Sequence, residues 1–401
     1  MSFSLFYCVS RLKFVKKVVF CIVLLFVLFC GLVSVFNVLP VKAQLETIYI
    51  RANGSVEPSE VPILNVGNVT YTFTDDVNAP IVVERSNIII DGNGYKLQGT
   101  GSGCGFNLTQ VNNVTVRKTN IHNFSFGVVL RHSSYNLVCE NNMTNRAYGV
   151  WLWWSPNNTI LENNIADNPT IGIRLEVSSN VTVSGNNVTG NGYGVFISWS
   201  SYNIVCNNNI VDNNEGIFVR SFCDFNLFFG NRIEGNIEGF HVEKSNNNTI
   251  FENDIIGNSL GIDVYIFCTY TSFFHNNIVN NNKQALTSYT MQGLVWDNGV
   301  EGNYWSNYTS MDLDGDGIGD NPHVIDESNQ DNFPLMNPFV SGDCDHDGIV
   351  NVKDASLLGL AWLSQQGEEN YNPHVDFNLD RTINIQDASV IEANWQRCWE
   401  G

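Results

Sequence analysis

Basic side chains are scarce in this sequence. Its 401 residues include 20 Lys and Arg against 40 Asp and Glu, which gives a formal net charge of −20. Such a chain is not a nucleic-acid binder with a broad basic surface, because it would repel the phosphate backbone. Charged residues make up only 15% of the chain and hydrophobic residues 43%, which also excludes a disordered protein.

Several common catalytic motifs are missing as well. The sequence contains no nucleophile elbow, P-loop or zinc-binding helix motif, so it gives no sign of the enzyme classes that carry them. Asn and Gly are frequent instead, and both residue types favour turns. We therefore expect a fold of short strands and turns, and the length suggests two or three domains.

The chain begins with a hydrophobic leader. Val18 to Leu39 carry no charge, follow four basic residues, and precede a small-residue pattern that ends at Ala43. We expect residues 1–43 to be a cleaved signal peptide, with a retained membrane anchor as the alternative, because the apolar stretch is long enough to span a bilayer. The rest of the chain is then extracellular or at the cell surface, and it meets a membrane only if this segment is uncleaved.

The middle of the chain is an internal repeat. Apolar residues that follow paired polar residues recur every 22 or 23 residues, and so do glycines that are each followed by alternating apolar positions. Periods of this length indicate a solenoid, and two short alternating segments per period make its unit β-structure. We expect a coiled parallel sheet with about 4.8 Å between coils. The two sets are Ile121, Met143, Ile165, Val188, Ile210, Ile233, Ile255 and Ile278, and Gly127, Gly149, Gly172, Gly194, Gly216, Gly239 and Gly261.

Recurrent Asn pairs fit the corners of such coils. Asn tolerates left-handed backbone geometry, and stacked amides can hydrogen-bond from coil to coil. Cysteines that share a coil position are two or three coils apart, about 10 and 14 Å, which is beyond the reach of a disulfide, so we interpret them as small hydrophobes. The Asn pairs begin at Asn141, Asn163, Asn186 and Asn208; the cysteines are Cys139 with Cys206 and Cys223 with Cys268.

The region from Leu45 to Leu335 resembles a known family. It is similar to the NosD-type proteins, within the wider group of carbohydrate-binding and sugar-hydrolase β-helices. The resemblance implies an all-β, right-handed parallel β-helix over residues 45–310. We do not carry over the copper role in the family's name, because the seven His are scattered and form no paired-His or Met-rich cluster. The segments that carry the resemblance are Thr47 to Arg51, Ile81 to Arg85, Asn87 to Tyr95, Gly302 to Tyr308 and Asp326 to Leu335.

One outer face of the solenoid is a candidate binding surface. In the strand after each repeat glycine, the second and fourth residues should point outward. These columns contain exposed aromatic residues among Arg and carboxylates, which suits stacking and hydrogen bonding to a polysaccharide. The alternative is a surface ladder in which the aromatic rings pack on one another and Arg220 pairs with Glu243. The candidate substrate-binding residues are Trp151, Trp153, Arg174, Glu176, Phe196, Phe218 and Arg220.

The same face offers one candidate catalytic group. Glycoside hydrolysis needs two carboxyl groups about 5 to 9.5 Å apart. Glu243 and Asp263 lie diagonally on adjacent coils at roughly 8 Å by strand spacing, and His241 lies beside them. These three residues are therefore the candidate catalytic residues of a glycoside hydrolase. A polysaccharide lyase would need Ca²⁺ and a basic residue above it, for which Arg174 or Arg220 gives little support.

The C-terminal part is strongly acidic. Residues 311–401 hold 18 acidic and three basic residues, a density that calls for cations. Residues 311–337 form an acidic closing segment in which oxygen-bearing side chains alternate with glycines, the arrangement that Ca²⁺ prefers. The alternative is a solvated acidic turn. The candidate ligands are Asp312, Asp314, Asp316 and Asp320.

Two twelve-residue loops follow, and each precedes a helical stretch, Ala355 to Leu363 and Ala388 to Gln396. Both loops place Ca²⁺ ligands at positions 1, 3, 5, 7, 9 and 12, where position 7 uses its backbone carbonyl. Cys344 and Cys398 bracket this module and are the best candidates for a disulfide. The ligand sets are Asp343, Asp345, Asp347, Ile349, Asn351 and Asp354, and Asp376, Asn378, Asp380, Thr382, Asn384 and Asp387.

The paired loops, each with a helix only on its exit side, resemble a type I dockerin over residues 342–399. The resemblance implies Ca²⁺ as cofactor and a cohesin-type partner, with intramolecular docking onto the β-helix as the alternative. Arg381 departs from the usual Gly at position 6 of the second loop. Val352-Lys353 and Ile385-Gln386 replace the Ser/Thr pairs of many cellulosomal dockerins, which leaves the identity of the partner open.

Three functions agree with these observations. The first is a secreted surface protein whose β-helix interacts with polysaccharide and which is attached through a calcium-loaded dockerin. The second is a polysaccharide-degrading enzyme, because dockerins commonly accompany such enzymes. The third is a structural surface protein whose aromatic face binds nothing.

Overall fold

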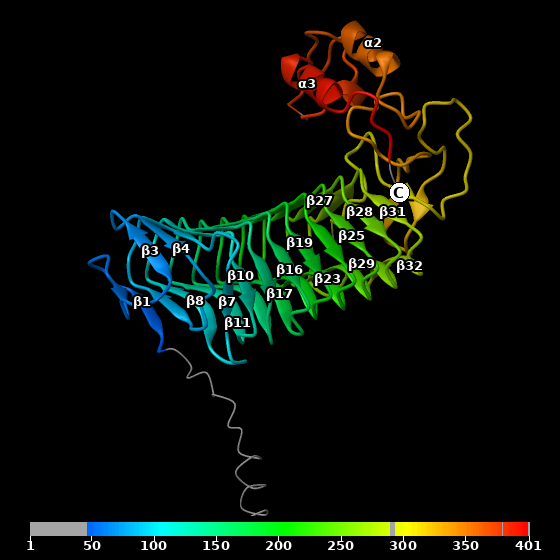
Figure 1. Ribbon diagram of the computed structural model, residues 1–401. Coiled ribbons are helices and arrows are strands. Elements are labelled where there is room, and N and C mark those ends of the chain that lie inside the picture. Colours follow the sequence, from blue (N-terminus) through cyan, green and yellow to red (C-terminus); the bar gives the residue numbers. More distant parts are fainter. Residues whose placement is uncertain (1–45, 289–292, 379, 400–401) are drawn as a thin grey trace, which may run out of the picture. The chain divides into compact units, whose positions relative to one another are not determined.

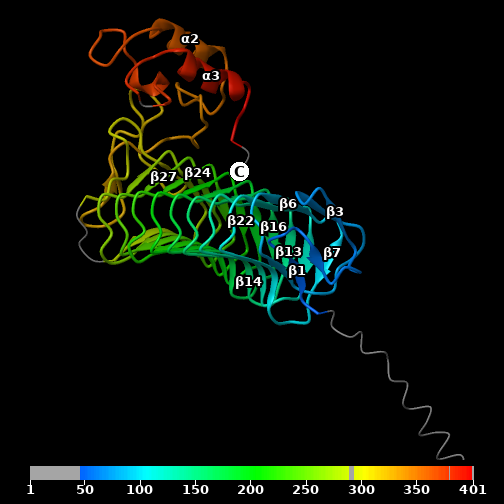
Figure 2. The ribbon, with the colours of Figure 1, turned by 90° about the vertical axis from the view of Figure 1, so that its left-hand side faces the viewer.

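The computed structural model describes residues 46–288, 293–378 and 380–399. Most of them form a parallel β-solenoid, which confirms the predicted fold. Figure 1 shows strands of successive coils lying side by side from β1 to β32, and Figure 2 separates the faces, with β24 and β27 on one side and β14 on another. Each coil contributes one strand to each of three long sheets, so strands paired in space are one coil apart in sequence.

The first sheet has twelve strands, and the pairs within its repeat are parallel. In spatial order it contains β2 (Val56–Glu57), β1 (Ile48–Ile50), β5 (Ile81–Val83), β8 (Cys104–Thr109), β11 (Phe126–Arg131), β14 (Tyr148–Trp153), β17 (Ile171–Glu176), β20 (Tyr193–Ser198), β23 (Glu215–Arg220), β26 (Glu238–Glu243), β29 (Leu260–Val264) and β32 (Lys283–Thr287).

The second sheet contains β3 (Ile63–Val66), β4 (Thr70–Phe73), β6 (Ile88–Asp91), β9 (Val114–Arg117), β12 (Leu137–Cys139), β15 (Thr159–Leu161), β18 (Thr182–Ser184), β21 (Ile204–Cys206), β24 (Leu227–Phe229), β27 (Thr249–Phe251) and β30 (Ser272–Phe274). The third contains β33 (Tyr304–Trp305), β31 (Asn277–Val279), β28 (Asp254–Ile256), β25 (Arg232–Glu234), β22 (Asn209–Val211), β19 (Asn187–Thr189), β16 (Asn164–Ala166), β13 (Asn142–Thr144), β10 (Asn120–His122) and β7 (Lys96–Gln98). A short antiparallel pair, β34 (His323–Val324) and β35 (Gln330–Asp331), follows.

The interior is a continuous apolar column. The repeating apolar residues from Ile121 to Ile278 are fully buried in it, and the repeating glycines are the second residues of strands of the first sheet. These glycines are required by close packing rather than by φ, because a Cβ on Gly194 would lie 2.5 Å from the carbonyl oxygen of Gly216 in the next coil. A coil without this glycine could not approach its neighbour at strand spacing.

The Asn pairs behave partly as expected. The first member of each pair is buried, and its amide donates to the next coil, as from Asn163 to Asn186 at 3.0 Å and from Asn186 to Asn208 at 2.9 Å. We expected the left-handed backbone on these Asn residues. It lies instead on the residue before each pair, such as Glu140 with φ 54° and Glu162 with φ 53°. The buried amide needs an inward side chain, so the corner turns one residue earlier.

The C-terminal module has its own small core. Its elements are α2 (Val352–Leu360), the 3-10 helix η1 (Pro373–Val375) and α3 (Ile385–Ala393). Both α-helices begin and end three residues before the predicted bounds. They begin early because Asn351 and Asn384 cap them in capping boxes, and the chain is left-handed at Leu363 and Gln396, where the predictions ended. The core contains Val340, Cys344, Val350, Leu358, Ala361, Val375, Ile383 and Ile391.

Candidate functional site

Each helix of the C-terminal module positions the last carboxylate of a predicted calcium loop. Asp354 is the third residue of α2 and Asp387 the third residue of α3, and both are fully buried. The carboxylate of Asp354 accepts hydrogen bonds from the amides of Cys344 and Asn351 at 2.8 and 2.7 Å. Asp387 accepts from Phe377 and Asn384 at 3.0 and 2.9 Å in the same way. Backbone amides at positions 2 and 9 therefore hold the position-12 carboxylate of each loop.

The first loop fits a calcium ion. Oxygen atoms of Asp343, Asp345 and Asp354 lie within 4.8 Å of one another. Asp343 is 5% exposed, and its Oδ1 has no hydrogen-bond partner among the described residues. Burial, together with the neighbouring Asp354, raises the pKa of Asp343 to about 6. A hard cation would satisfy this oxygen and stabilise the ionised carboxylates.

The second loop has the same backbone design with one difference. The amide of Arg381 donates to Asp376 at 2.8 Å, as the amide of Gly348 donates to Asp343 at 2.7 Å. Position 6 is left-handed in both loops, with φ 89° at Gly348 and 70° at Arg381. Glycine adopts this conformation without strain and arginine does not. The second loop is therefore the more strained of the two.

The predicted disulfide is wrong in this structure: Cys344 and Cys398 are both free thiols. Cys344 packs in the core of the C-terminal module, where its Sγ lies 3.5 Å from both the carbonyl oxygen and Oδ1 of Asp354. Cys398 is exposed, and its backbone pairs with Ile349. The two cysteines lie at either end of the module in the sequence, but these positions did not show that one thiol points into the core while the other faces solvent.

The acidic closing segment forms a compact loop. Asp312 accepts hydrogen bonds from the amides of Gly315 and Gly317 at 2.7 and 3.0 Å. Although its slight desolvation acts the other way, these amides lower the pKa of Asp312. Oxygen atoms of Asp312, Asp314 and Asp316 lie within 4.8 Å of one another. The fourth predicted ligand, Asp320, instead accepts from the amide of Leu313 at 2.8 Å, so calcium binding here stays a prediction.

The aromatic residues of the solenoid gather on the outer face of the first sheet. Tyr148 stacks on Phe126 with ring centroids 4.9 Å apart, and Trp151 lies 5.9 Å from Tyr148 and 6.3 Å from Trp153. Arg131 lies over both Trp rings at 5.3 and 5.5 Å. These rings form a partly exposed aromatic surface on adjacent coils.

Charged side chains border this aromatic surface. The guanidinium of Arg174 lies 5.5 Å from both the Trp151 and Phe196 rings. It also forms an ion pair with Glu176 at 3.0 Å, and Glu176 accepts from the indole nitrogen of Trp151 at 3.2 Å. The structure therefore brings Trp151, Arg174 and Glu176 together, as the column pattern indicated.

The column formed by the second residues after the repeat glycines is less exposed than we expected. Val129 is 1% and Phe218 5% exposed. Phe218 is covered because Tyr193, Phe196 and His241 stack around it, with the His241 ring only 4.3 Å away. Arg220 pairs with Glu243 at 3.1 Å, as the ladder alternative proposed. On strands β20, β23 and β26, the outer face is thus partly a ladder of side chains that pack on one another.

An acidic cluster around His241 follows on the same face. Nδ1 of His241 lies 3.0 Å from Glu238 and 3.5 Å from Glu215, and Nε2 lies 3.9 Å from Asp263. Neither ring nitrogen makes a well-aligned hydrogen bond to a described residue. Of the predicted catalytic residues, His241 and Asp263 lie together, whereas Glu243 is occupied by Arg220.

The environment of this cluster shifts its pKa values. Burial raises the pKa of Glu238 and that of Asp263, more than His241 lowers either. Burial alone would disfavour the imidazolium of His241, but the carboxylates of Glu215, Asp263 and Glu238 outweigh it and raise its pKa. Carboxylates with raised pKa values beside an imidazole are a feature of sites that perform general acid–base chemistry.

Sequence reasoning missed Glu215 and Glu238. Each lies directly before a repeat glycine, where strict alternation would point its side chain inward. Strand pairing aligns the residues before and after each glycine with their counterparts in the next coil, but the glycine itself is not paired. The side chain before the glycine therefore lies on the outer face, together with those of the second and fourth residues after it. The signal was present, because Phe126, Tyr148 and Tyr193 occupy the same position.

A second aromatic row was also missed. Eight aromatic side chains of the solenoid are 47–70% exposed, and all eight have a left-handed backbone, which is rare for bulky residues and is often found at functional sites. Two pairs are in ring contact: Trp199 lies tilted against Phe222 at 4.9 Å, and Tyr202 stacks on Phe225 at 5.3 Å. We call these residues the aromatic ledge; they are Tyr135, Trp154, Trp199, Tyr202, Phe222, Phe225, Phe267 and Tyr270. Several follow directly after strands of the first sheet.

Comparison with known proteins agrees with this architecture. A family model described as periplasmic copper-binding protein (NosD) matches residues 86–310, more than half of the chain. The chain belongs to the NosD family. A second model, the type I dockerin domain, matches residues 341–394. The C-terminal module of this NosD-family chain is thus a type I dockerin domain, a calcium-binding domain that indicates attachment to a cohesin partner, and the two matches together indicate an exported protein.

No curated protein matches the sequence. Among solved structures, the A-module of the Azotobacter vinelandii mannuronan C-5 epimerase AlgE4 shares 13% identity at a TM-score of 0.43, over 63% of this chain and 84% of that chain. A double mutant of the tailspike protein of E. coli bacteriophage HK620 shares 13% identity at a TM-score of 0.47, over 58% of this chain and 54% of its own. These likenesses concern the fold alone.

The predicted leader, residues 1–43, lies outside the described residues. Within the part of the chain that the structure describes, no helix has the length and apolar character needed to cross a bilayer.

Proposed function

We propose that this chain is an exported surface protein whose solenoid binds a polysaccharide along the first sheet and whose calcium-loaded dockerin attaches it to a cohesin. The observation that supports polysaccharide binding best is the pair of aromatic rows, one on the outer face around Trp151 and Trp153 and one on the aromatic ledge. Rings on successive coils, about 4.8 Å apart, offer stacking surfaces to consecutive sugar rings. Large exposed apolar patches of this kind mark binding surfaces.

The polar groups beside the rings would supply orientation. Arg174 and Glu176 lie against Trp151 and are partly exposed, so they can exchange their mutual contact for hydrogen bonds to hydroxyl or carboxylate groups of a sugar. Arg131 lies over both Trp rings and extends the same surface. Such a mixture of stacking faces and hydrogen-bonding groups is the chemistry that carbohydrate recognition uses.

Substitution of the two tryptophans tests this proposal. The purified chain with Ca²⁺ is incubated with immobilised neutral and acidic polysaccharides, and retention is measured for the unaltered chain and for Trp151→Ala/Trp153→Ala. We expect the double variant to lose retention. Phe229→Ala is the matched control, because Phe229 stacks on Phe251 on the second sheet and should retain binding. Equal retention by all three proteins, or none by the unaltered chain, would contradict the proposal.

An enzyme of polysaccharide breakdown is the second candidate function. The cluster of Glu215, Glu238, His241 and Asp263 favours it, because one buried and one half-buried carboxylate with raised pKa values, Asp263 and Glu238, lie beside an imidazole on the same face. Released reducing or unsaturated ends, measured in the same incubation, distinguish the two functions. Product that disappears in Asp263→Asn and His241→Asn would establish an enzyme, and retention without product would leave a binding protein.

Attachment through the dockerin needs its own experiment. The first residues of α2 and α3, Val352 and Ile385, are 67% and 71% exposed, so two apolar side chains face solvent where a partner could cover them. We expect the chain to be captured by a cohesin only when Ca²⁺ is present, and Val352→Glu with Ile385→Glu to weaken capture. Capture that is unaffected by calcium would contradict this attachment, and absence of both sugar binding and capture would favour a purely structural role.

A further inference from the structure

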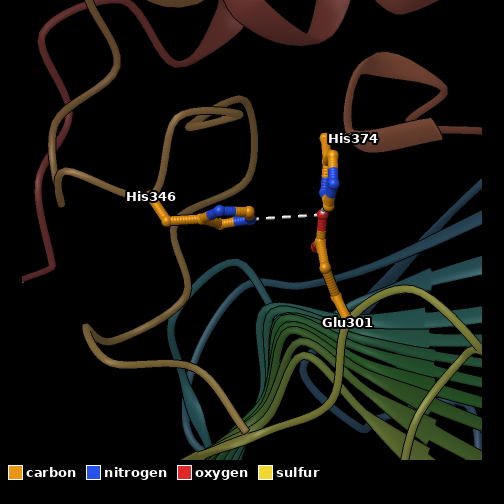
Figure 3. Close-up of side chains that lie close together, drawn as sticks. All are labelled: Glu301, His346 and His374. Carbon is orange, nitrogen blue, oxygen red and sulfur yellow. Dashed lines mark hydrogen bonds and ion pairs between the residues drawn. The ribbon is translucent and has the colours of Figure 1, made fainter. Parts of the chain in front are cut away.

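The structure gathers three of the seven histidines around one buried carboxylate. Glu301, in the segment between β32 and β33, has its Oε1 3.2 Å from Nε2 of His346 and 2.5 Å from Nδ1 of His374 (Figure 3). Its Oε2 lies 2.7 Å from Nε2 of His275. Sequence spacing does not indicate this cluster, because the four residues are spread over 100 positions and belong to two domains.

His346 points an unsatisfied ring nitrogen at Glu301. Its side chain is 5% exposed, and its Nδ1 lies 3.0 Å from the carbonyl oxygen of Asp316. A carbonyl only accepts, so Nδ1 carries a proton and donates it, which leaves the lone pair of a neutral imidazole on Nε2. Nε2 is buried, points at Glu301 and has no hydrogen-bond partner of good geometry among the described residues. A lone pair facing a carboxylate oxygen needs a proton or a metal ion between them.

We propose that Glu301, His346 and His374 bind a divalent first-row transition metal ion, with Zn²⁺ as the best fit. Their ligand atoms all lie within 4.8 Å of one another. Bonds of about 2.0 to 2.1 Å in a tetrahedral zinc site place ligand atoms roughly 3.3 Å apart, close to the 3.2 Å between Glu301 and His346. His374 needs to move away from Glu301 by only about 1 Å to reach the same spacing.

The donor set selects the class of metal. Two imidazoles and one carboxylate are typical of zinc sites that keep a fourth position for water, whereas Ca²⁺ and Mg²⁺ prefer oxygen ligands. The carbonyl of Asp316 is the outer partner that fixes the tautomer of His346, and His275 orients Glu301 through its other oxygen. A cavity of about 310 Å³ borders His275, Glu301 and His374 and gives room for the fourth ligand.

The site would join the two domains of the chain. Glu301 lies within the NosD match and both histidine ligands lie within the dockerin match, so the site is not a property of either family alone. His346 is also position 4 of the first calcium loop, between Asp345 and Asp347. A bound ion would therefore fix that loop against the segment between β32 and β33 that contains Glu301.

Metal retention tests this proposal. The purified chain is equilibrated with Zn²⁺ in the presence of excess Ca²⁺, freed of unbound metal by gel filtration, and its zinc content is measured by mass spectrometry. We expect one zinc ion per chain, and none above background for His346→Gln or His374→Gln. The matched control is His122→Gln on β10, which should keep its zinc. Co²⁺ in place of Zn²⁺ should give the visible absorption of a tetrahedral site.

The outcomes are distinct. No zinc on the unaltered chain, or equal zinc on all variants, would overturn the proposal in favour of a proton-bridged cluster or of scattered surface binding. Because a variant could lose zinc by misfolding, Glu301→Gln is measured as well, together with calcium-dependent helix content by circular dichroism. Loss of zinc with unchanged helix content supports the site, and retention of zinc by Glu301→Gln with both histidine variants also loaded contradicts it.

Discussion

Among single residues, Asp331 is a buried carboxyl group with a raised pKa. It is fully buried at the end of the solenoid, where its Oδ2 accepts from the indole of Trp305 at 2.8 Å and from the amide of Asn303 at 2.7 Å. Burial outweighs these donors and raises the pKa of Asp331 to about 6. The carboxyl group of Asp331 thus holds Trp305 and Asn303 by hydrogen bonds, although burial disfavours its ionised form.

We expect Asp331 to make stability fall as pH rises. Its pKa is about 3.9 in an unfolded chain, so between about pH 4 and pH 6 the folded state binds the extra proton, and the free energy of unfolding decreases with pH. The shift of about two units corresponds to at most about 3 kcal/mol. Chemical denaturation at pH 4.5 and pH 7, compared with Asp331→Asn, measures it. A difference between the two proteins that does not change with pH would contradict this prediction.

Arg381 is the residue where the second calcium loop departs from the first. Replacing it with glycine removes a left-handed non-glycine backbone at φ 70°, which costs roughly 1–2 kcal/mol and is partly offset by the freedom of glycine in the unfolded chain. We expect Arg381→Gly to tighten Ca²⁺ binding to the second loop by about fivefold, or about 1 kcal/mol. Calorimetric titration with Ca²⁺ measures the change.

The first loop supplies the converse control. Gly348 has φ 89° and open space around its Cα, so Gly348→Ala adds strain without a clash and should weaken Ca²⁺ binding to the first loop. If neither substitution alters affinity, backbone strain at position 6 does not limit calcium binding.

Residue-level predictions succeeded where a local pattern carries them. The loop spacing found Asp343, Asp354 and Asp387, whose contacts lie within one loop and one helix turn. It did not find Glu301, His346 and His374, because their meeting depends on how the segment after β32 returns to the dockerin. Glu215 and Glu238 were missed for a different reason, since the alternation rule fails across the repeat glycine. Long-range contacts and local irregularities are not encoded by spacing.

Among the elements, the coils are linked by ladders of buried amides as well as by backbone pairing. Asn208 is 1% exposed; its Nδ2 donates to Asn231 at 2.9 Å, to the carbonyl of Cys206 at 2.9 Å and to that of Val183 at 3.0 Å. These bonds satisfy corner groups that would otherwise be buried without partners. Each amide therefore connects three successive coils.

We expect Asn208→Ala to destabilise the solenoid by about 2–4 kcal/mol, because each buried group left unpaired costs about 1–3 kcal/mol. Asn209→Ala is the matched control: Asn209 is the next residue and exposed, and its amide donates to Asn187 at 2.7 Å. We expect this surface change to cost less than about 1 kcal/mol. Denaturant unfolding of both variants measures the difference. Equal losses would show that the buried ladder has no special role.

The elements were the most predictable part of the fold. A period of 22 or 23 residues defines a coil, since each repeat must return the chain to the same point one strand spacing away. The bounds of α2 and α3 were predicted three residues late, because position 9 was assigned only to calcium although Asn351 and Asn384 also cap the helices. The spacing pattern alone does not show that one Asn side chain both occupies position 9 of a calcium loop and caps a helix.

At the scale of the whole molecule, the residues that the structure describes form two hydrophobic cores. One runs through the solenoid from Ile48 to Trp305, and the other contains eight buried residues of the dockerin domain. The contacts between these parts are polar, such as the indole of Trp399 donating to Asp254 at 2.9 Å and the amide of Asn277 donating to the carbonyl of Phe339 at 3.1 Å. Separate cores joined by polar contacts should unfold separately.

Calcium removal should therefore affect one domain only. The dockerin core is small, and its loops bury Asp343, Asp354, Asp376 and Asp387, whose mutual repulsion a bound cation would relieve. In calcium-free buffer we expect amide hydrogen exchange to accelerate strongly in α2 and α3, while the strands from β5 to β31 keep their protection, and calcium should restore the helices. Mg²⁺ at the same concentration is the control, because it favours a smaller octahedral shell. Unchanged protection of both helices without calcium would show that the loops are held by their backbone hydrogen bonds alone.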